Sequence, residues 1–178
     1  MFTRQTVAAL AVLLALPVVA GAEVKNLGPG GFTSQHQRLL DAPPAEVYAA
    51  MTGRISEWWE GSHSWSADAN NLYVDASPGG CFCERLPNGG WVEHLRVVYL
   101  APGQAIRFKG SLGPLLDLGL DGTMSWQLQP GEEGGTRLTW TYIVHGYLEG
   151  GFEGLAPVVD AVNGAQVNGL EALLGQKN

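Results

Sequence analysis

From residue 72 to residue 145 the sequence consists of short segments with alternating apolar residues, separated by turns, and a single long helical pattern follows them. Apolar residues at every second position are typical of strands with one buried face. We expect strands at 32–40, 72–75, 81–86, 91–100, 105–109, 123–129 and 136–145. With two short helices after the first strand and a long helix at 156–174, this order predicts an α+β fold in which a curved antiparallel sheet wraps around the last helix.

The C-terminal helix has a continuous apolar stripe. Its members follow helical spacing and are Leu155, Val158, Val159, Val162, Gln166, Leu170 and Leu173. Gly164 and Gly169 interrupt the helix at a cost of roughly 1 kcal/mol each relative to Ala. These glycines either bring the helix close to the sheet or leave volume beneath it.

The first 22 residues have the pattern of a secretory signal peptide. Arg4 precedes an apolar run of about fifteen residues, and small residues at 20–22 form a cleavage site of the A-x-A type. The run is shorter than the roughly 20 residues that span a bilayer, so we expect no stable membrane insertion after cleavage. The sequence therefore predicts a signal peptide at 1–22, a flexible lead-in at 23–31 and one domain at 32–176. The expected location is outside the cytoplasm, in the periplasm.

The net charge, the number of cysteines and the absence of several well-known motifs disfavour certain classes of function. The formal net charge is -7, which disfavours nucleic acid or an anionic membrane as a partner. Two cysteines are too few for the disulfide framework of a small secreted domain. The sequence has no phosphate-binding loop, dinucleotide fingerprint, catalytic serine motif or HExxH motif. These observations favour a binding protein that needs no cofactor over an enzyme.

Five short motifs occur in the order found in one superfamily. They are Ala42-Pro43-Pro44-Ala45-Glu46-Val47-Tyr48, the pair Trp58-Trp59, the turn Ser77-Pro78-Gly79-Gly80, the hairpin from Val97 to Phe108, and Gly135-Thr136-Arg137-Leu138-Thr139. In this order the chain resembles the SRPBCC/START superfamily, in the branch of polyketide cyclases and homologues of a chaperone ATPase activator. The resemblance implies a helix-grip fold with an apolar cavity open to small ligands, but no single chemistry. A chaperone-cofactor role does not suit an exported protein, which meets no cytosolic ATP-driven chaperone.

An apolar cavity is expected between the inner face of the sheet and the last helix, because that helix is the only long element able to cover the sheet. The side chains expected to face the ligand from these two surfaces are Phe108, Met124, Trp126, Val162 and Gln166. The alternative is a filled core without a cavity.

A polar cluster is expected on the hairpin that contains Asn88-Gly89. Asn-Gly favours a two-residue turn, which places Cys83 opposite His94 and Cys81 opposite Arg96. Directly opposed side chains have Cβ atoms about 4.5–5.5 Å apart, so the four residues form one patch. Alignment with the inward positions of the superfamily places His94 and Arg96 inside the cavity.

Several roles remain open for this patch. The two cysteines are expected to lie too far apart along an extended strand to form a disulfide. They are candidates for a copper or zinc site with His94, or for a nucleophile at Cys83 with His94 as base, although no carboxylate is expected to orient that histidine. Alternatively, His94 and Arg96 hold a polar ligand head group, or the cysteines are small core residues beside a surface arginine.

The remaining histidines are weaker candidates. His63 is expected in a loop at the rim of the cavity or in solvent, whereas His36 and His145 are expected to point outward from their strands. The sequence thus predicts an exported protein that binds a small apolar or amphipathic ligand, lipid-like or aromatic, in its cavity. A cyclase-like or hydrolase-like enzyme and a metal binder are the alternatives.

Overall fold

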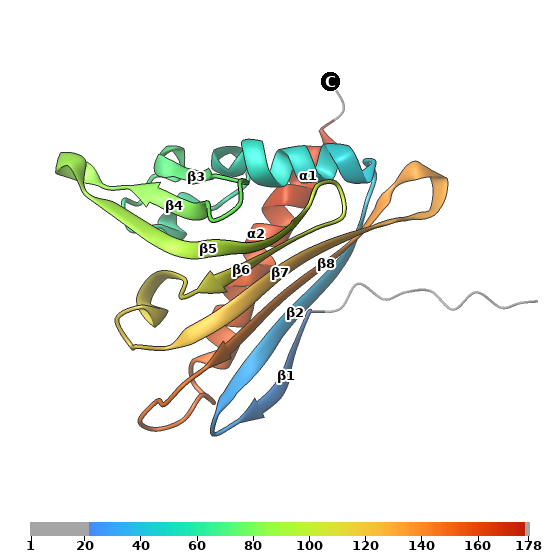
Figure 1. Ribbon diagram of the computed structural model, residues 1–178. Helices are drawn as coiled ribbons and strands as arrows, with labels where there is room; N and C mark the ends of the chain where they lie inside the picture. The colour runs from blue at the N-terminus through green and yellow to red at the C-terminus, as the bar shows by residue number, and fades with distance from the viewer. Residues whose placement is uncertain (1–21, 177–178) are drawn as a thin grey trace, which may run out of the picture.

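The alternating segments of the sequence form one curved antiparallel sheet, and the last apolar stripe forms a helix that lies across one face of that sheet (Figure 1). The computed structural model describes residues 22–176. Its eight strands are β1 (Ala22–Gly28), β2 (Gly31–Leu40), β3 (Leu72–Val74), β4 (Cys81–Arg85), β5 (Trp91–Ala101), β6 (Ala105–Gly110), β7 (Asp121–Pro130) and β8 (Thr136–His145). In the sheet they take the order β1-β2-β8-β7-β6-β5-β4-β3. The two helices are α1 (Pro44–Gly53) and α2 (Ala156–Gly175), so the α+β helix-grip fold is confirmed.

The predicted lead-in is instead the edge strand of the sheet. β1 pairs with β2 in the antiparallel sense, with Ala22 opposite His36 and Val24 opposite Ser34. A chain segment with few apolar residues still forms a strand there, because the exposed edge of β2 offers its backbone hydrogen-bonding groups. The predicted signal peptide lies outside the described residues except for Ala22, with which β1 begins.

The inner face of β7 and β8 forms a solid aromatic core, as the alternation predicts. Trp126 and Trp140 are cross-strand partners with ring centroids 4.9 Å apart. Trp58, which follows α1, meets both rings edge-on at 6.2 Å. Met124 and Leu138 are also buried on this face. This part of the sheet is therefore covered by aromatic and aliphatic side chains that pack against one another.

Gly169 brings α2 into close contact with the chain that follows α1. A Cβ atom at Gly169 would lie only 2.2 Å from the backbone oxygen of Trp58. Gly164 has a similar place opposite His36, where an added Cβ atom would lie 3.0 Å from the imidazole ring. Of the two roles expected for these glycines, close approach is the one that the structure shows.

His36 points inward, not outward as the sequence suggests. Its side chain is 1 % exposed between β2 and α2, and Nε2 lies 3.1 Å from Oδ1 of Asp160. Ser34 donates a hydrogen bond of 2.7 Å to the same carboxylate oxygen. The polar residues on β2 thus face a polar position of α2, which makes inward burial possible without an apolar pattern.

Among residues 22–176, no helix is long and apolar enough to cross a bilayer.

The apolar stripe of α2 is buried to different degrees in the two halves of the helix. In its second half, Gln166 and Leu170 are fully buried. In its first half, Val159 and Val162 are only half-buried, and Val158 is 59 % exposed. The first half therefore has an apolar side that no other element covers completely.

Candidate functional site

The uncovered side of α2 borders a cavity of about 540 Å³. It is lined by residues of the segment 59–65, by Leu72 of β3, Phe82 of β4 and His94 of β5, by residues of the segment 112–117, and by residues between 155 and 163 at the start of α2. Most of these side chains are apolar, and the volume is within the range of roughly 300–1,000 Å³ that is common for small-molecule sites. The cavity thus lies at the β3–β5 end of the sheet and meets the aromatic core at Trp59, whose ring centroid lies 6.4 Å from that of Trp140.

One wall of the cavity is aromatic. The rings of Trp59 and Phe82 meet edge-on with centroids 4.9 Å apart, and the Phe82 ring lies 5.3 Å from that of His94. Trp59 is fixed by a hydrogen bond of 3.2 Å from Nε1 to the backbone oxygen of His63. The wall is therefore held in place before any ligand enters.

A buried carboxylate, Glu84, anchors this wall. Its side chain is fully buried, and it accepts hydrogen bonds from the backbone N–H groups of Trp65 at 3.0 Å and Ser66 at 2.6 Å. The Nε2 atom of His94 lies 2.9 Å from the same carboxylate. Glu84 thus joins the loop at the cavity mouth to the histidine on β5.

The protonation states of this pair follow from their surroundings. Burial raises the pKa of Glu84, but the hydrogen bonds from Ser66, Trp65 and His94 outweigh it, and the net pKa is lowered. Burial also lowers the pKa of His94, against the opposing effect of Glu84. Near neutral pH the pair is therefore a carboxylate and a neutral imidazole, and Nε2 carries the hydrogen because an ionised carboxylate only accepts.

The β4–β5 hairpin contains a β-bulge that the sequence did not reveal. Arg85 pairs with Trp91 and Cys83 with Glu93, but Phe82 pairs with Leu95, so His94 is the extra residue. The prediction that Cys83 lies opposite His94 is therefore wrong. Asn88 and Gly89 do have positive φ, as expected, but they belong to a three-residue turn, and the bulge compensates for the extra turn residue.

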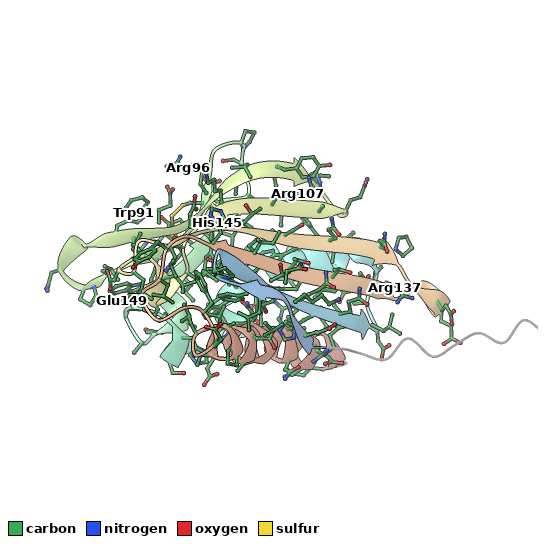
Figure 2. The ribbon with its side chains drawn as sticks, turned by 90° about the horizontal axis from the view of Figure 1, so that it is seen from below. Trp91, Arg96, Arg107, Arg137, His145 and Glu149 are labelled. Atoms are coloured by element: carbon green, nitrogen blue, oxygen red, sulfur yellow. A yellow bond between two sulfur atoms is a disulfide. The ribbon has the colours of Figure 1, made fainter. Side chains whose placement is uncertain are left out.

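Because the bulge offsets the extra turn residue, the residues beyond it pair as the sequence predicts. Cys81 lies opposite Arg96, as predicted. Arg96, however, lies on the outer face: its side chain is 57 % exposed and pairs with Glu93 at 2.7 Å. Figure 2 shows Arg96 and Trp91 on the side of the sheet turned away from α2. The bulge thus separates His94, inside, from Arg96, outside.

Cys81 and Cys83 form a disulfide, which corrects the expectation that they lie too far apart. Residues two apart in a regular antiparallel strand have Cα atoms about 6.8 Å apart. Here the distance is 5.4 Å, next to the bulge and within the usual disulfide range of roughly 4.4–6.8 Å. Neither sulfur is a free thiol. Both cysteines lie on the face of β4 opposite to that of Phe82, whereas His94 lies on the cavity side of the sheet. The two alternatives that need free thiols, a nucleophile at Cys83 and a metal site of two thiolates with His94, are therefore not assembled.

The other predicted site residues divide between the cavity and the core. Val162 lines the cavity. Phe108, Met124 and Trp126 are buried in the aromatic core and do not border the cavity.

Gln166 lies directly behind the lining of the cavity. Its Oε1 atom accepts the N–H of Glu60 at 2.8 Å, and its Nε2 atom lies 3.0 Å from Nδ1 of His63. His63 itself lines the cavity, as one of its expected positions implies. Gln166 therefore positions the loop that forms the cavity mouth.

Sequence reasoning missed Glu84 as a functional residue. Strand alternation was a usable signal, because Glu84 shares a face with Phe82, two positions before it, and Phe82 is apolar and inward. A charged side chain that points into the protein interior needs hydrogen-bond or ionic partners, because burial removes its hydration. Here they are the backbone groups of Trp65 and Ser66 and the bulged His94.

The fold agrees with comparisons with known proteins. The family model for "Polyketide cyclase / dehydrase and lipid transport" matches residues 32–175. The chain belongs to this family.

Solved structures of low sequence identity share the fold of this family member. Protein MLL2253 from Mesorhizobium loti has a TM-score of 0.59 at 18 % identity, over 82 % of this chain and 98 % of that one. CalU16 from Micromonospora echinospora has a TM-score of 0.57 at 16 % identity, over 88 % of this chain and 85 % of that one. No curated protein matches the sequence. The comparisons therefore establish the family and its ligand-binding fold.

Proposed function

We propose that the protein binds one small, largely apolar molecule in the cavity between α2 and the β3–β5 end of the sheet. The observation that carries this proposal is the cavity of about 540 Å³, with an aromatic wall and half-buried valines on α2. Val158 and Trp65, at 59 % and 46 % exposed, extend its apolar lining to the surface. Such a surface favours entry of a molecule that water solvates poorly.

Filling the cavity is expected to abolish this binding. Val162 lines the cavity but is only half-buried, so the larger side chain of Val162→Trp can occupy the space without displacing packed atoms. Titration with the fluorescent apolar probe N-phenyl-1-naphthylamine should show at least about tenfold weaker binding, equivalent to about 1.4 kcal/mol.

The matched control is Val98→Trp, because Val98 is 57 % exposed on β5 and lies outside the cavity lining. Its affinity for the probe should equal that of the unaltered protein. Absence of probe binding to the unaltered protein, or equal binding to the Val162→Trp variant, would contradict the proposed site.

We also propose that the protein acts after export, in an oxidising compartment such as the periplasm. The signal-peptide pattern of the first 22 residues supports this location. A disulfide between Cys81 and Cys83 also supports it, since such bonds are typical of proteins outside the cytoplasm.

If the protein is exported and its signal peptide is removed, the mature chain is shorter than the full sequence. When the full sequence is expressed in a Gram-negative host, the intact mass of the protein from the periplasmic fraction should correspond to a chain that begins at Glu23. A full-length chain that remains in the cytoplasmic fraction would refute the proposed location and leave the proposed ligand site unaffected.

A further inference from the structure

The disulfide between Cys81 and Cys83 joins two residues of the same strand, so it connects no separate elements of the fold. The entropy that a disulfide removes from the unfolded chain grows with the length of the loop that it closes. Here that loop has a single residue between the cysteines. The bond therefore adds less to overall stability than one between distant segments would add, and what it constrains directly is the local course of β4.

This constraint coincides with the bulge of the β4–β5 hairpin. The pairing of the two strands shifts between Phe82 and Cys83, which is inside the disulfide loop. The Cα atoms of Cys81 and Cys83 are 5.4 Å apart, whereas a regular extended strand places such atoms about 6.8 Å apart. When the bond is broken, the two sulfur atoms must move apart to a non-bonded distance, and β4 is free to extend at this position.

Phe82, the residue between the two cysteines, connects this part of β4 with the cavity. Successive side chains of a strand point to opposite faces, so Phe82 points to the cavity while the cysteines point away from it. Its ring centroid lies 4.9 Å from that of Trp59 and 5.3 Å from that of His94. Extension of β4 therefore moves one member of the aromatic wall relative to the other two.

Glu84, the next inward residue of β4, extends the effect to the cavity mouth. Its carboxylate accepts hydrogen bonds from the backbone N–H groups of Trp65 at 3.0 Å and Ser66 at 2.6 Å. These bonds hold the loop at the mouth against β4, so a shift of Glu84 along the strand distorts or breaks them. The disulfide thus fixes both the wall and the mouth of the cavity from the opposite face of the sheet.

The two cysteines differ in their access to solvent. Cys81 is half-buried, whereas Cys83 is fully buried. In the reduced chain, the thiolate of Cys81 is therefore the group that attacks an external disulfide, and a mixed disulfide forms as one thiol of the oxidant leaves. Cys83 then attacks the sulfur of Cys81, which closes the internal bond and releases the second thiol. Two electrons and two protons pass from the protein to the oxidant, a disulfide compound of an oxidising compartment.

We propose that formation of this disulfide switches the cavity from a weakly binding to a binding-competent state after export. The chain is synthesised with two free thiols and acquires the bond only in an oxidising compartment. Oxidation then shortens β4 at the bulge and sets Phe82 and Glu84 in the positions described above. This inference rests on the proposed binding of an apolar molecule in the same cavity.

The test compares the oxidised and the reduced protein by titration with N-phenyl-1-naphthylamine. Reduction with tris(2-carboxyethyl)phosphine should weaken probe binding at least about fivefold, the lower end of typical coupling between two sites. Removal of the reductant and addition of oxidised glutathione should restore the affinity. Far-UV circular dichroism of each form shows whether the protein is folded during the titration.

The matched control is the double variant Cys81→Ala/Cys83→Ala, which cannot form the bond. It should bind the probe as weakly as the reduced protein does, and neither reductant nor oxidant should change its affinity.

Hydrogen exchange provides a readout that does not depend on whether this variant folds. In the unaltered protein, the amides of Trp65 and Ser66 should exchange faster after reduction, because their bonds to Glu84 loosen. A disulfide that only stabilised the fold would lower the midpoint of thermal unfolding on reduction, without a change in probe affinity or in exchange at these two amides.

The outcomes separate this inference from the proposed function. Equal affinity of the two forms, or tighter binding by the reduced form, would overturn the switch and leave the ligand site in place. A reduced protein that unfolds would also overturn the switch, because the bond would then support the fold as a whole. If neither form binds the probe, the proposed function fails, and this inference fails with it.

Discussion

Replacing Glu84 by Ala is expected to lower the free energy of unfolding by about 3 kcal/mol, because each buried donor left without an acceptor costs about 1–3 kcal/mol. Three hydrogen bonds end on the fully buried carboxylate, two from the backbone of Trp65 and Ser66 and one from His94. In the variant these donors lie in a cavity too apolar to replace the lost acceptor. The loop at the cavity mouth should therefore also lose its order. Urea unfolding at neutral pH measures the first effect, and hydrogen exchange at Trp65 and Ser66 measures the second.

The matched control is Glu93→Ala on the neighbouring strand. Glu93 lies on the outer face, and its ion pair with Arg96 has partners that are 26 % and 57 % exposed. Exposed pairs of this kind contribute roughly 0–1 kcal/mol, so this variant should remain close to the unaltered protein. Similar losses in the two variants would mean that Glu84 has no special role in the wall of the cavity.

Replacing Gly169 by Ala is expected to destabilise the protein by about 2 kcal/mol, although Ala is the better helix former. The new methyl carbon would lie 2.2 Å from the backbone oxygen of Trp58, which is itself held in the aromatic core. Neither partner is the flexible end of a side chain, so α2 must move away from the chain after α1. The movement should lower both the midpoint of thermal unfolding and the affinity for an apolar probe, because Trp59 is adjacent.

Gly175 provides the comparison, since it ends α2 and a Cβ atom there would meet nothing within 4 Å. Gly175→Ala should be neutral or slightly stabilising. A Gly169→Ala variant as stable as Gly175→Ala would show that α2 does not pack against Trp58 as closely as described.

The strand pattern predicted most of the fold because its signals are local. Met124 and Trp126 alternate with polar residues on β7, as Leu138 and Trp140 do on β8, and all four are buried as expected. Burial of one face follows directly from a period of two. β1 was missed for the converse reason: its residues have no strong pattern, and its pairing depends on the edge that β2 presents.

The candidate site was only partly predictable because it depends on one residue of register. The sequence correctly placed Val162 at the cavity and Cys81 opposite Arg96. Whether a hairpin has a two-residue turn, or a three-residue turn with a bulge, changes few local contacts, but it decides which side chains face inward.

The amino-acid sequence by itself determined the sheet, the long helix and the apolar inner face of this protein, since periodicity and turn residues specify them within a few positions. Only the tertiary structure decided that His94 meets Glu84 while Arg96 points outward, that Cys81 and Cys83 bond, and that the first half of α2 borders an open cavity. These features depend on contacts between segments far apart in the chain. Whether these contacts form depends on how the sheet, the loop at 59–66 and the helix pack together, and no local sequence pattern specifies that packing.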